Sequence, residues 1–226
     1  MKFLILFALF ALPFFAGAQL TSVIGKTTYK YWLYLPADSI LKNKPPIIIF
    51  LHGRSLSGTD LNRVKRYGVI HEIDEGRTLP AIVIGPQVVS GSWSPDLILE
   101  VLNQVQTKYG ADSNRVYVCG MSLGGYGTMH FAGKYPDRVA AAVALCGGGD
   151  TRDACNLANL PFWIQHGTAD EAVPVSESRK IRDAIVACNG GSQLIYREIA
   201  GANHGAMERV FRSDELYDWL FQHVKP

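Results

Sequence analysis

Short apolar segments recur along the chain, and segments with helical spacing separate them. Residues 47–51, 81–84, 116–119, 142–146 and 162–165 are almost entirely apolar, with several β-branched side chains. Strands without an alternating polar face belong in a sheet that is buried on both sides, and such sheets are usually parallel. Residues 29–35 and 194–199 have enough apolar and aromatic side chains to form two further strands.

The segments between these strands place apolar residues on one face of a helix. We expect helices over residues 95–109, 123–135, 176–188 and 213–223. Strands that alternate with helices predict an α/β fold, a doubly wound sheet with helices on both faces. We find no repeat, low-complexity tract or linker, so residues 19–226 are expected to form one domain.

The N-terminus has the order of a secretory signal peptide. Lys2 precedes an apolar run over residues 3–15, and Ala16-Gly17-Ala18 offers a small-x-small cleavage site. The alternative is a membrane anchor, but Pro13 interrupts the run, which is short for a span of about 20 residues. We therefore expect residues 1–18 to be removed and the protein to be secreted or periplasmic, without a stable membrane anchor.

Charge and metal-binding residue types exclude some function classes. The chain has 22 Lys and Arg against 20 Asp and Glu, and the positive charge is scattered, so we expect no nucleic-acid partner. The four cysteines and six histidines have no spacing typical of a zinc site. We expect neither a metal nor another cofactor, and the sequence leaves the oligomeric state open.

A G-x-S-x-G motif, Gly120-Met121-Ser122-Leu123-Gly124, lies between the strand 116–119 and the small-residue helix that follows it. That context is typical of the nucleophile elbow of the α/β-hydrolase fold, where glycines make room for a strained serine. Ser122 is therefore the predicted nucleophile, presented above a helix N-terminus. The alternative is a glycine-rich turn with an incidental serine.

A serine nucleophile needs a histidine base and a carboxylate that orients it, and in this fold they follow the serine in the order acid, then histidine. His204 lies in a loop after the last strand and is the predicted base. Asp170 follows the strand 162–165 and is the predicted acid. Asp150, which follows the preceding strand, is the main alternative, and Asp153 and Glu171 are weaker ones.

The loops at the same edge predict further site residues. The main-chain N–H groups of Leu123 and Arg54 are expected to form the oxyanion hole. The Arg54 side chain either contacts an anionic or carbohydrate-like part of a substrate or is solvated. Trp93 either forms a wall of the substrate site or is a core aromatic. The connection between residues 146 and 162 is short and glycine-rich, so we expect no lid domain.

Several motifs together resemble known enzymes. They are Leu51-His52-Gly53, the segment 120–128, Cys146-Gly147-Gly148-Gly149-Asp150, the segment 166–175 and Asn203-His204-Gly205. The chain resembles small bacterial carboxylesterases, near the phospholipase/carboxylesterase, dienelactone hydrolase and prolyl-oligopeptidase-like families. Dienelactone hydrolases use a cysteine where Ser122 stands, which argues against that activity.

This resemblance implies a serine esterase that acts on a small-molecule or polysaccharide-borne ester through Ser122, His204 and Asp170. Acetyl and feruloyl esters of plant polysaccharides are attractive by analogy alone. A peptidase or thioesterase with the same triad is the alternative enzyme, and a non-catalytic binding protein on the same scaffold is the alternative outside enzymes.

The cysteines divide into two pairs. Cys119 and Cys146 lie in neighbouring apolar strands and are expected to be buried thiols. Cys155 precedes the strand 162–165 and Cys188 ends the helix after it, so both should approach the same part of the sheet. Export would allow oxidation, and we predict a Cys155–Cys188 disulfide, with two free thiols as the alternative.

Overall fold

The computed structural model describes residues 17–188 and 191–225. The predicted signal peptide therefore lies almost entirely outside the described residues. The first strand, β1, begins at Gln19, the residue at which the mature chain is expected to start.

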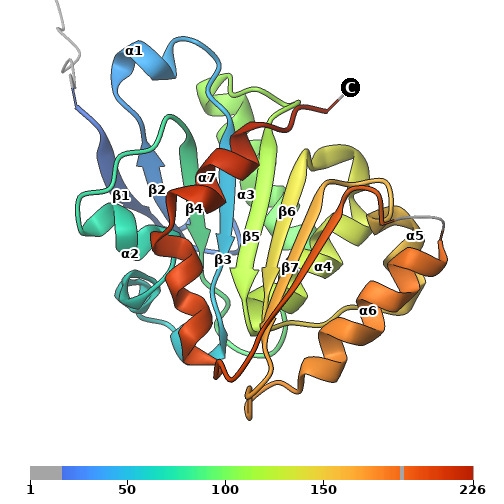
Figure 1. The fold of residues 1–226 in the computed structure, drawn as a ribbon. Coiled ribbons are helices and arrows are strands. Elements are labelled where there is room, and N and C mark those ends of the chain that lie inside the picture. Colours follow the sequence, from blue (N-terminus) through green and yellow to red (C-terminus); the bar gives the residue numbers. More distant parts are fainter. Residues whose placement is uncertain (1–16, 189–190, 226) are drawn as a thin grey trace, which may run out of the picture.

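The centre of the fold is an eight-stranded sheet in the order β1-β2-β4-β3-β5-β6-β7-β8 (Figure 1). Pairs from β4 to β8 are parallel, whereas β1 pairs antiparallel with β2 and β2 with β4. The strands are β1 Gln19–Val23, β2 Tyr31–Leu35, β3 Ile47–Leu51, β4 Ile82–Pro86, β5 Val116–Met121, β6 Ala141–Leu145, β7 Phe162–Gly167 and β8 Leu194–Ile199. The prediction of a mostly parallel α/β sheet is confirmed.

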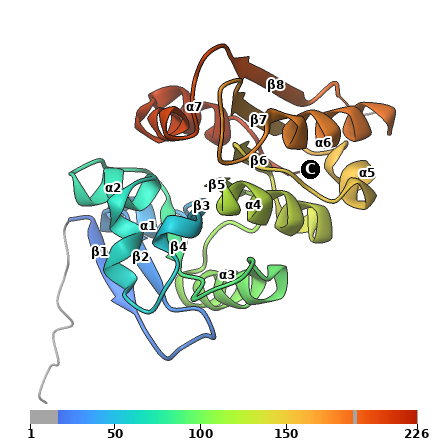
Figure 2. The same ribbon diagram turned by 90° about the horizontal axis from the view of Figure 1, so that it is seen from below.

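The apolar strands are buried on both faces, as their sequences predicted. In β3, Ile47, Ile49 and Leu51 pack into one hydrophobic core, whereas Ile48 and Phe50 point into the other. Helices α3 (Pro95–Tyr109), α4 (Leu123–Lys134) and α6 (Val175–Ala187) cover the first face, and α2 (Val69–Asp74) and α7 (Asp214–Phe221) cover the second (Figure 2). This three-layer arrangement leaves no polar face for the central strands, which explains their lack of alternation.

The four predicted helices form within a residue or two of their expected ends. They are α3 Pro95–Tyr109, α4 Leu123–Lys134, α6 Val175–Ala187 and α7 Asp214–Phe221. Gly110 ends α3 in the left-handed conformation (φ 62°), which glycine adopts without strain. The hydroxyl of Ser213 accepts a hydrogen bond from the Glu215 N–H and thereby caps α7.

Some short elements were not predicted. They are β1 and the helices α1 Asp38–Leu41, α2 Val69–Asp74 and α5 Ala154–Leu157. Each has at most six residues, too few to show a clear period, and β1 is a partly exposed edge strand. Among the residues that the structure describes, no helix has the length and apolar character needed to cross a membrane.

The connection between β6 and β7 is compact. It contains a short 3₁₀ helix, Thr151–Asp153, followed by α5, whose Ala154 and Leu157 are buried in the core beneath α4 and α6. As predicted, the connection contributes no lid domain within the described residues.

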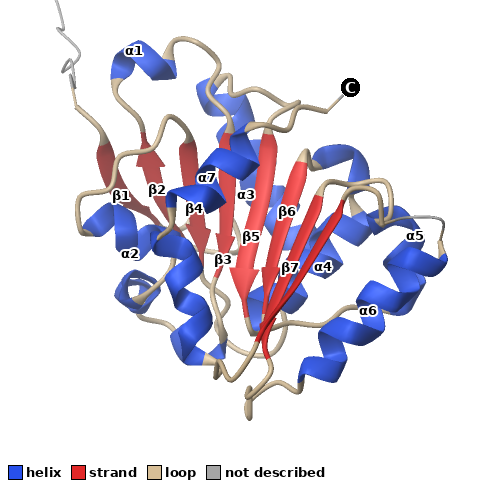
Figure 3. Cartoon of the chain, in the orientation of Figure 1, coloured by secondary structure: helices blue, strands red, loops and turns tan. Residues whose placement is uncertain are grey.

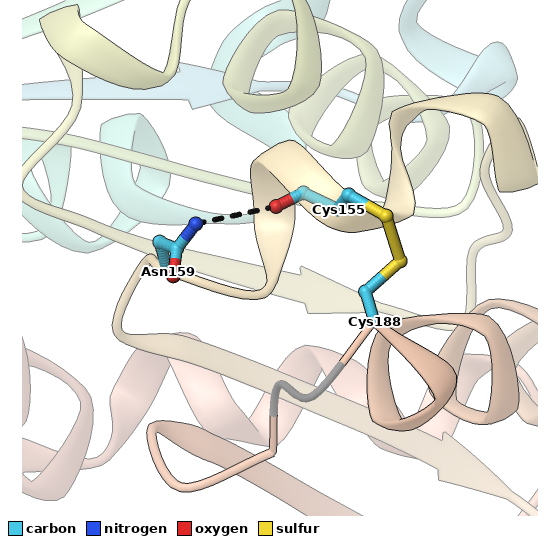
Figure 4. The surroundings of a disulfide bond; sticks show 3 residues. All are labelled: Cys155, Asn159 and Cys188. Carbon is cyan, nitrogen blue, oxygen red and sulfur yellow. Dashed lines mark hydrogen bonds between the residues drawn. A yellow bond between two sulfur atoms is a disulfide. The ribbon is translucent and has the colours of Figure 1, made fainter.

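The predicted disulfide is present. Cys155 in α5 and Cys188 at the end of α6 are bonded, with their Cα atoms 5.1 Å apart (Figure 4). The carbonyl of Cys155 also accepts a hydrogen bond from the Asn159 side chain at 3.5 Å. Cys119 and Cys146 are buried free thiols, as expected.

Candidate active site

Ser122 occupies a strained turn between β5 and α4. Its φ of 60° is left-handed, a conformation that non-glycine residues rarely adopt, and its N–H donates to the Leu145 carbonyl at 2.8 Å. A Cβ atom on Gly120 would overlap the carbonyls of Gly124 and Leu51, and one on Gly124 would overlap that of Leu51. The two glycines thus permit the close main-chain approach that forces Ser122 into this geometry.

His204 and Asp170 form a hydrogen-bonded pair. His204 Nδ1 lies 2.6 Å from Oδ2 of Asp170, whose side chain is fully buried, while one quarter of the His204 side chain is exposed. The other carboxylate oxygen, Oδ1, accepts hydrogen bonds from the N–H groups of Ala172 at 2.9 Å and Val173 at 2.8 Å. Burial by itself would raise the pKa of Asp170, but the Val173 N–H, His204 and the Ala172 N–H together hold that pKa below its usual value.

The alternative acid, Asp150, has a different environment. Its carboxylate is bonded to the side chain and N–H of Arg152 at the surface, and this pairing lowers its pKa to about 2. Asp150 is not among the described residues that line the pocket around Ser122 and His204. Of the two candidates, the structure brings only Asp170 to the histidine.

Trp93 does not form a wall of the substrate site. It is 3% exposed, and its indole N–H donates to the His52 carbonyl at 3.1 Å. Its ring packs edge-on against His52 and Tyr29, and a Cβ atom on Gly127 of α4 would overlap it. The tentative substrate role is therefore corrected: Trp93 is a core aromatic that supports the loop after β3.

A pocket of about 540 Å³ opens above Ser122. This volume falls in the range of small-molecule sites. Its walls combine apolar, aromatic and charged side chains from four loops, namely Gly53, Arg54, Ser55, Tyr67, Met121, Ser122, Leu123, Tyr126, Ala172, Val173, His204, Gly205 and Glu208. These loops lie at the carboxyl ends of the parallel strands, the lower edge of the sheet in Figure 3.

Two N–H groups in this pocket fit the oxyanion hole expected from the sequence. Leu123 is the first residue of α4, and Arg54 is the first residue of the 3₁₀ helix Arg54–Leu56. The N–H of the first helical residue has no acceptor within its own helix. The neighbouring Gly53 N–H is already used, because it donates to the Tyr67 hydroxyl at 2.8 Å.

Three residues around the site were not given a functional role from the sequence. Tyr67 holds the loop that contains Arg54, and the buried Cys146 thiol lies within 4.8 Å of the Asp170 and His204 side chains. Burial, and then the nearby Asp170 carboxylate, raise the pKa of Cys146. His166, which precedes Gly167 at the end of β7, contacts Asp170 as well. No local pattern marks Tyr67, whereas Cys146 and His166 both lie in segments that carry the resemblance described above.

A family model, several related proteins and solved structures resemble this chain. The family model described as "Putative esterase" matches residues 22–203. Feruloyl esterase D of Neurospora crassa is 28% identical over 211 residues, which cover 86% of this chain and 71% of that protein. Feruloyl esterase B of Talaromyces funiculosus is 28% identical over 162 residues, which cover 64% of this chain and 44% of that protein.

Among solved structures, the crystal structure of a thermostable esterase has a TM-score of 0.75 at 26% identity. The match covers 92% of this chain and 63% of that one. The chain therefore spans less than two thirds of the length of the Talaromyces protein and of this structure.

Proposed function

The chain belongs to this esterase family, and from that premise we propose that it hydrolyses carboxylic esters with Ser122, His204 and Asp170 as its catalytic triad. The observation that carries the proposal is that three features lie together around one pocket. They are a strained serine after β5, a histidine whose Nδ1 is bonded to a buried carboxylate, and two N–H groups at the starts of helices.

The proposed reaction follows from which ring nitrogen of His204 is not already bonded to Asp170. Because His204 Nδ1 is bonded to Asp170, its Nε2 is the atom that accepts the Ser122 hydroxyl proton as Oγ attacks the ester carbonyl. The N–H groups of Leu123 and Arg54 stabilise the resulting oxyanion. His204 then gives the proton to the leaving alcohol, an acyl-enzyme remains, and a water molecule activated by the same histidine releases the acid.

We propose that the acyl group is aromatic and that its alcohol is a polysaccharide. Two related proteins are named feruloyl esterases, and the pocket offers Tyr67, Tyr126 and Met121 for an aromatic ring. Arg54 and Glu208 at the same pocket supply charged groups for hydroxyls of a sugar or a phenol.

We also propose that the protein is exported, since its N-terminus has the order of a signal peptide. The Cys155–Cys188 disulfide supports this proposal, because such bonds persist mainly in oxidising compartments. Detection of the protein outside the cytoplasm, with its N-terminus at Gln19, is the expected result. A retained Met1 would contradict it.

The decisive experiment compares wild type with Ser122→Ala. Wild type should hydrolyse methyl ferulate and p-nitrophenyl acetate and react with a fluorophosphonate probe. The variant should remain folded and lose at least about 10⁴-fold in kcat. Peptide and acyl-CoA substrates test the peptidase and thioesterase alternatives. Near-normal turnover by a folded Ser122→Ala variant would refute the proposed nucleophile.

A further inference from the structure

A second histidine lies on the buried side of Asp170. His166, in β7, is wholly buried, and its Nε2 lies 2.9 Å from the Val173 carbonyl and 3.2 Å from Oδ2 of Asp170. A carbonyl and an ionised carboxylate only accept hydrogen bonds. His166 Nε2 must therefore carry a hydrogen atom, which is hydrogen-bonded to the Val173 carbonyl, with Oδ2 of Asp170 as a second, longer contact of the same nitrogen.

The other ring nitrogen is bonded just as closely. His166 Nδ1 lies 2.7 Å from the hydroxyl oxygen of Ser178 in α6, and that oxygen lies 2.7 Å from the Gly147 carbonyl. Ser178 has one hydroxyl proton, so it either donates to Nδ1 or accepts from Nδ1–H and donates to Gly147. In the first arrangement the single hydrogen of a neutral ring is on Nε2, whereas in the second both ring nitrogens carry hydrogen and the ring is cationic. Both arrangements therefore leave a hydrogen on Nε2, the nitrogen that faces Asp170.

Oδ2 of Asp170 is thus shared by two imidazoles, His204 from the pocket and His166 from the core. Oδ1 is held by the N–H groups of Ala172 and Val173. These contacts on both oxygens restrict the rotation of the carboxylate.

We propose that His166 is a positioning residue for the acid–base pair, which holds Oδ2 of Asp170 in line with His204 through its Nε2–H group. This inference rests on the proposed function and extends it. His166 contacts neither the pocket nor Ser122, so it acts through Asp170. Its role is to keep the carboxylate fixed while His204 takes up and releases a proton.

Four other ionisable groups, from four elements, lie beside Asp170, in the adjoining pocket or in contact with a residue that lines it. Cys146 lies after β6, Tyr126 is in α4, Glu177 is in α6, and Glu208 lies in the 3₁₀ helix after His204. Burial raises the pKa of Tyr126 to about 12, with smaller contributions from Glu177 and Asp170. Both Tyr126 and Cys146 are therefore neutral near pH 7, so neither adds a charge beside Asp170.

The first test uses the intact protein and does not depend on turnover. In protein labelled with ¹⁵N-histidine, the ring nitrogen shifts and couplings identify which nitrogen carries hydrogen. We expect His166 to have a hydrogen on Nε2 throughout the pH range in which the protein is folded. An Nε2 without hydrogen would overturn the proposal, even if Ser122→Ala abolishes activity as the proposed function requires.

The second test compares His166→Gln with His166→Leu. The first variant retains an amide N–H that can reach the position of Nε2, whereas the second has no donor. We expect His166→Leu to lose on the order of 10²-fold in kcat with little change in KM, and His166→Gln to recover most of that loss. His71→Leu in α2 is the control, because the partly buried His71 ring is likewise bonded to a main-chain carbonyl, that of Lys65.

The pH dependence of kcat/KM distinguishes this role from a purely structural one, which would leave the pH dependence unchanged. Without the His166 N–H, the Asp170 carboxylate interacts more strongly with protonated His204, so the acidic limb of kcat/KM should move up by about 0.5–1 pH unit. A folded His166→Leu variant with unchanged kcat and acidic limb would overturn the proposal. So would a His166→Gln variant as impaired as His166→Leu. If His166→Leu does not fold, the ¹⁵N measurement and the comparison of His166→Gln with wild type decide the question.

Discussion

At the scale of single residues, two aspartates with similar sequence context lie in different environments. Asp170 and Asp150 both follow parallel strands, but only Asp170 is bonded to two N–H groups and to His204, with His166 Nε2 at 3.2 Å from its Oδ2. Asp150 instead lies at the surface and is neutralised by its neighbour Arg152. The environment, not the residue type, gives Asp170 the role of orienting a base.

This contrast leads to a paired prediction. Asp170→Asn is almost isosteric, but it removes the charge that holds His204 in the correct tautomer. We expect a loss on the order of 10⁴-fold in kcat, the cost of the equivalent change in a serine protease triad. Asp150→Asn is the matched control and should stay near wild-type activity. Steady-state kinetics of both folded variants on p-nitrophenyl acetate would check this, and the reverse ranking would assign the acid to Asp150.

At the scale of elements, the glycines of α4 allow close packing against neighbouring segments at the expense of helix propensity. Helix α4 contains four glycines, a composition that disfavours helix formation. A side chain at any of the four would collide with a neighbour; for example, a Cβ atom on Gly125 would overlap the Leu145 carbonyl and one on Gly127 would overlap Trp93. The burial of α4 against the sheet stabilises a helix that would be weak alone.

The disulfide links two other elements, α5 and α6. It closes a loop with a sequence separation of 33, which stabilises the fold by roughly 3–4 kcal/mol in the chain-entropy model. We expect Cys155→Ser/Cys188→Ser to lower the melting temperature by on the order of 10 °C. Neither cysteine lines the pocket, so turnover at 25 °C should stay near wild type.

Calorimetry and a kinetic assay on the same sample would measure both effects of removing the bridge. Cys119→Ser is the control for losing a thiol that forms no bridge. A large loss of turnover in the double variant, at a temperature where it is folded, would show that the bridge also supports the site.

At the scale of the whole molecule, the topology of the sheet assembles the site. Ser122 follows β5, Asp170 follows β7 and His204 follows β8, and because these strands are parallel their carboxyl ends meet at one edge. The β6–β7 connection, where α5 packs beneath α4 and α6, leaves this edge uncovered. Within the part of the chain that the structure describes, the pocket is therefore open, without a lid domain.

An open pocket predicts simple kinetics with short-chain esters. Enzymes whose site is covered by a lid gain activity when the substrate forms an interface, since the interface opens the lid. Here the rate with tributyrin should rise smoothly and saturate as its concentration passes the solubility limit. A lidded lipase measured in parallel is the control. A sharp increase in rate at the solubility limit would contradict the prediction.

The sequence by itself determined the features that depend on neighbouring residues. The apolar strands and helical periods are local patterns, so all seven predicted strands and all four predicted helices appear in the structure. The elbow around Ser122 is also local, because glycines two residues to either side make the turn possible. The order of serine, acid and histidine along the chain then made His204 the predicted base.

Only the tertiary structure decided which distant groups meet. The distinction between Asp170 and Asp150, the burial of Trp93, and the contacts of His166 and Tyr67 all depend on loops that are far apart in sequence. The edge strand β1 belongs here as well, because it is defined by its pairing with β2. A residue's own type and neighbours determine its local conformation, but its hydrogen-bond partners and burial depend on how the sheet brings separate segments together.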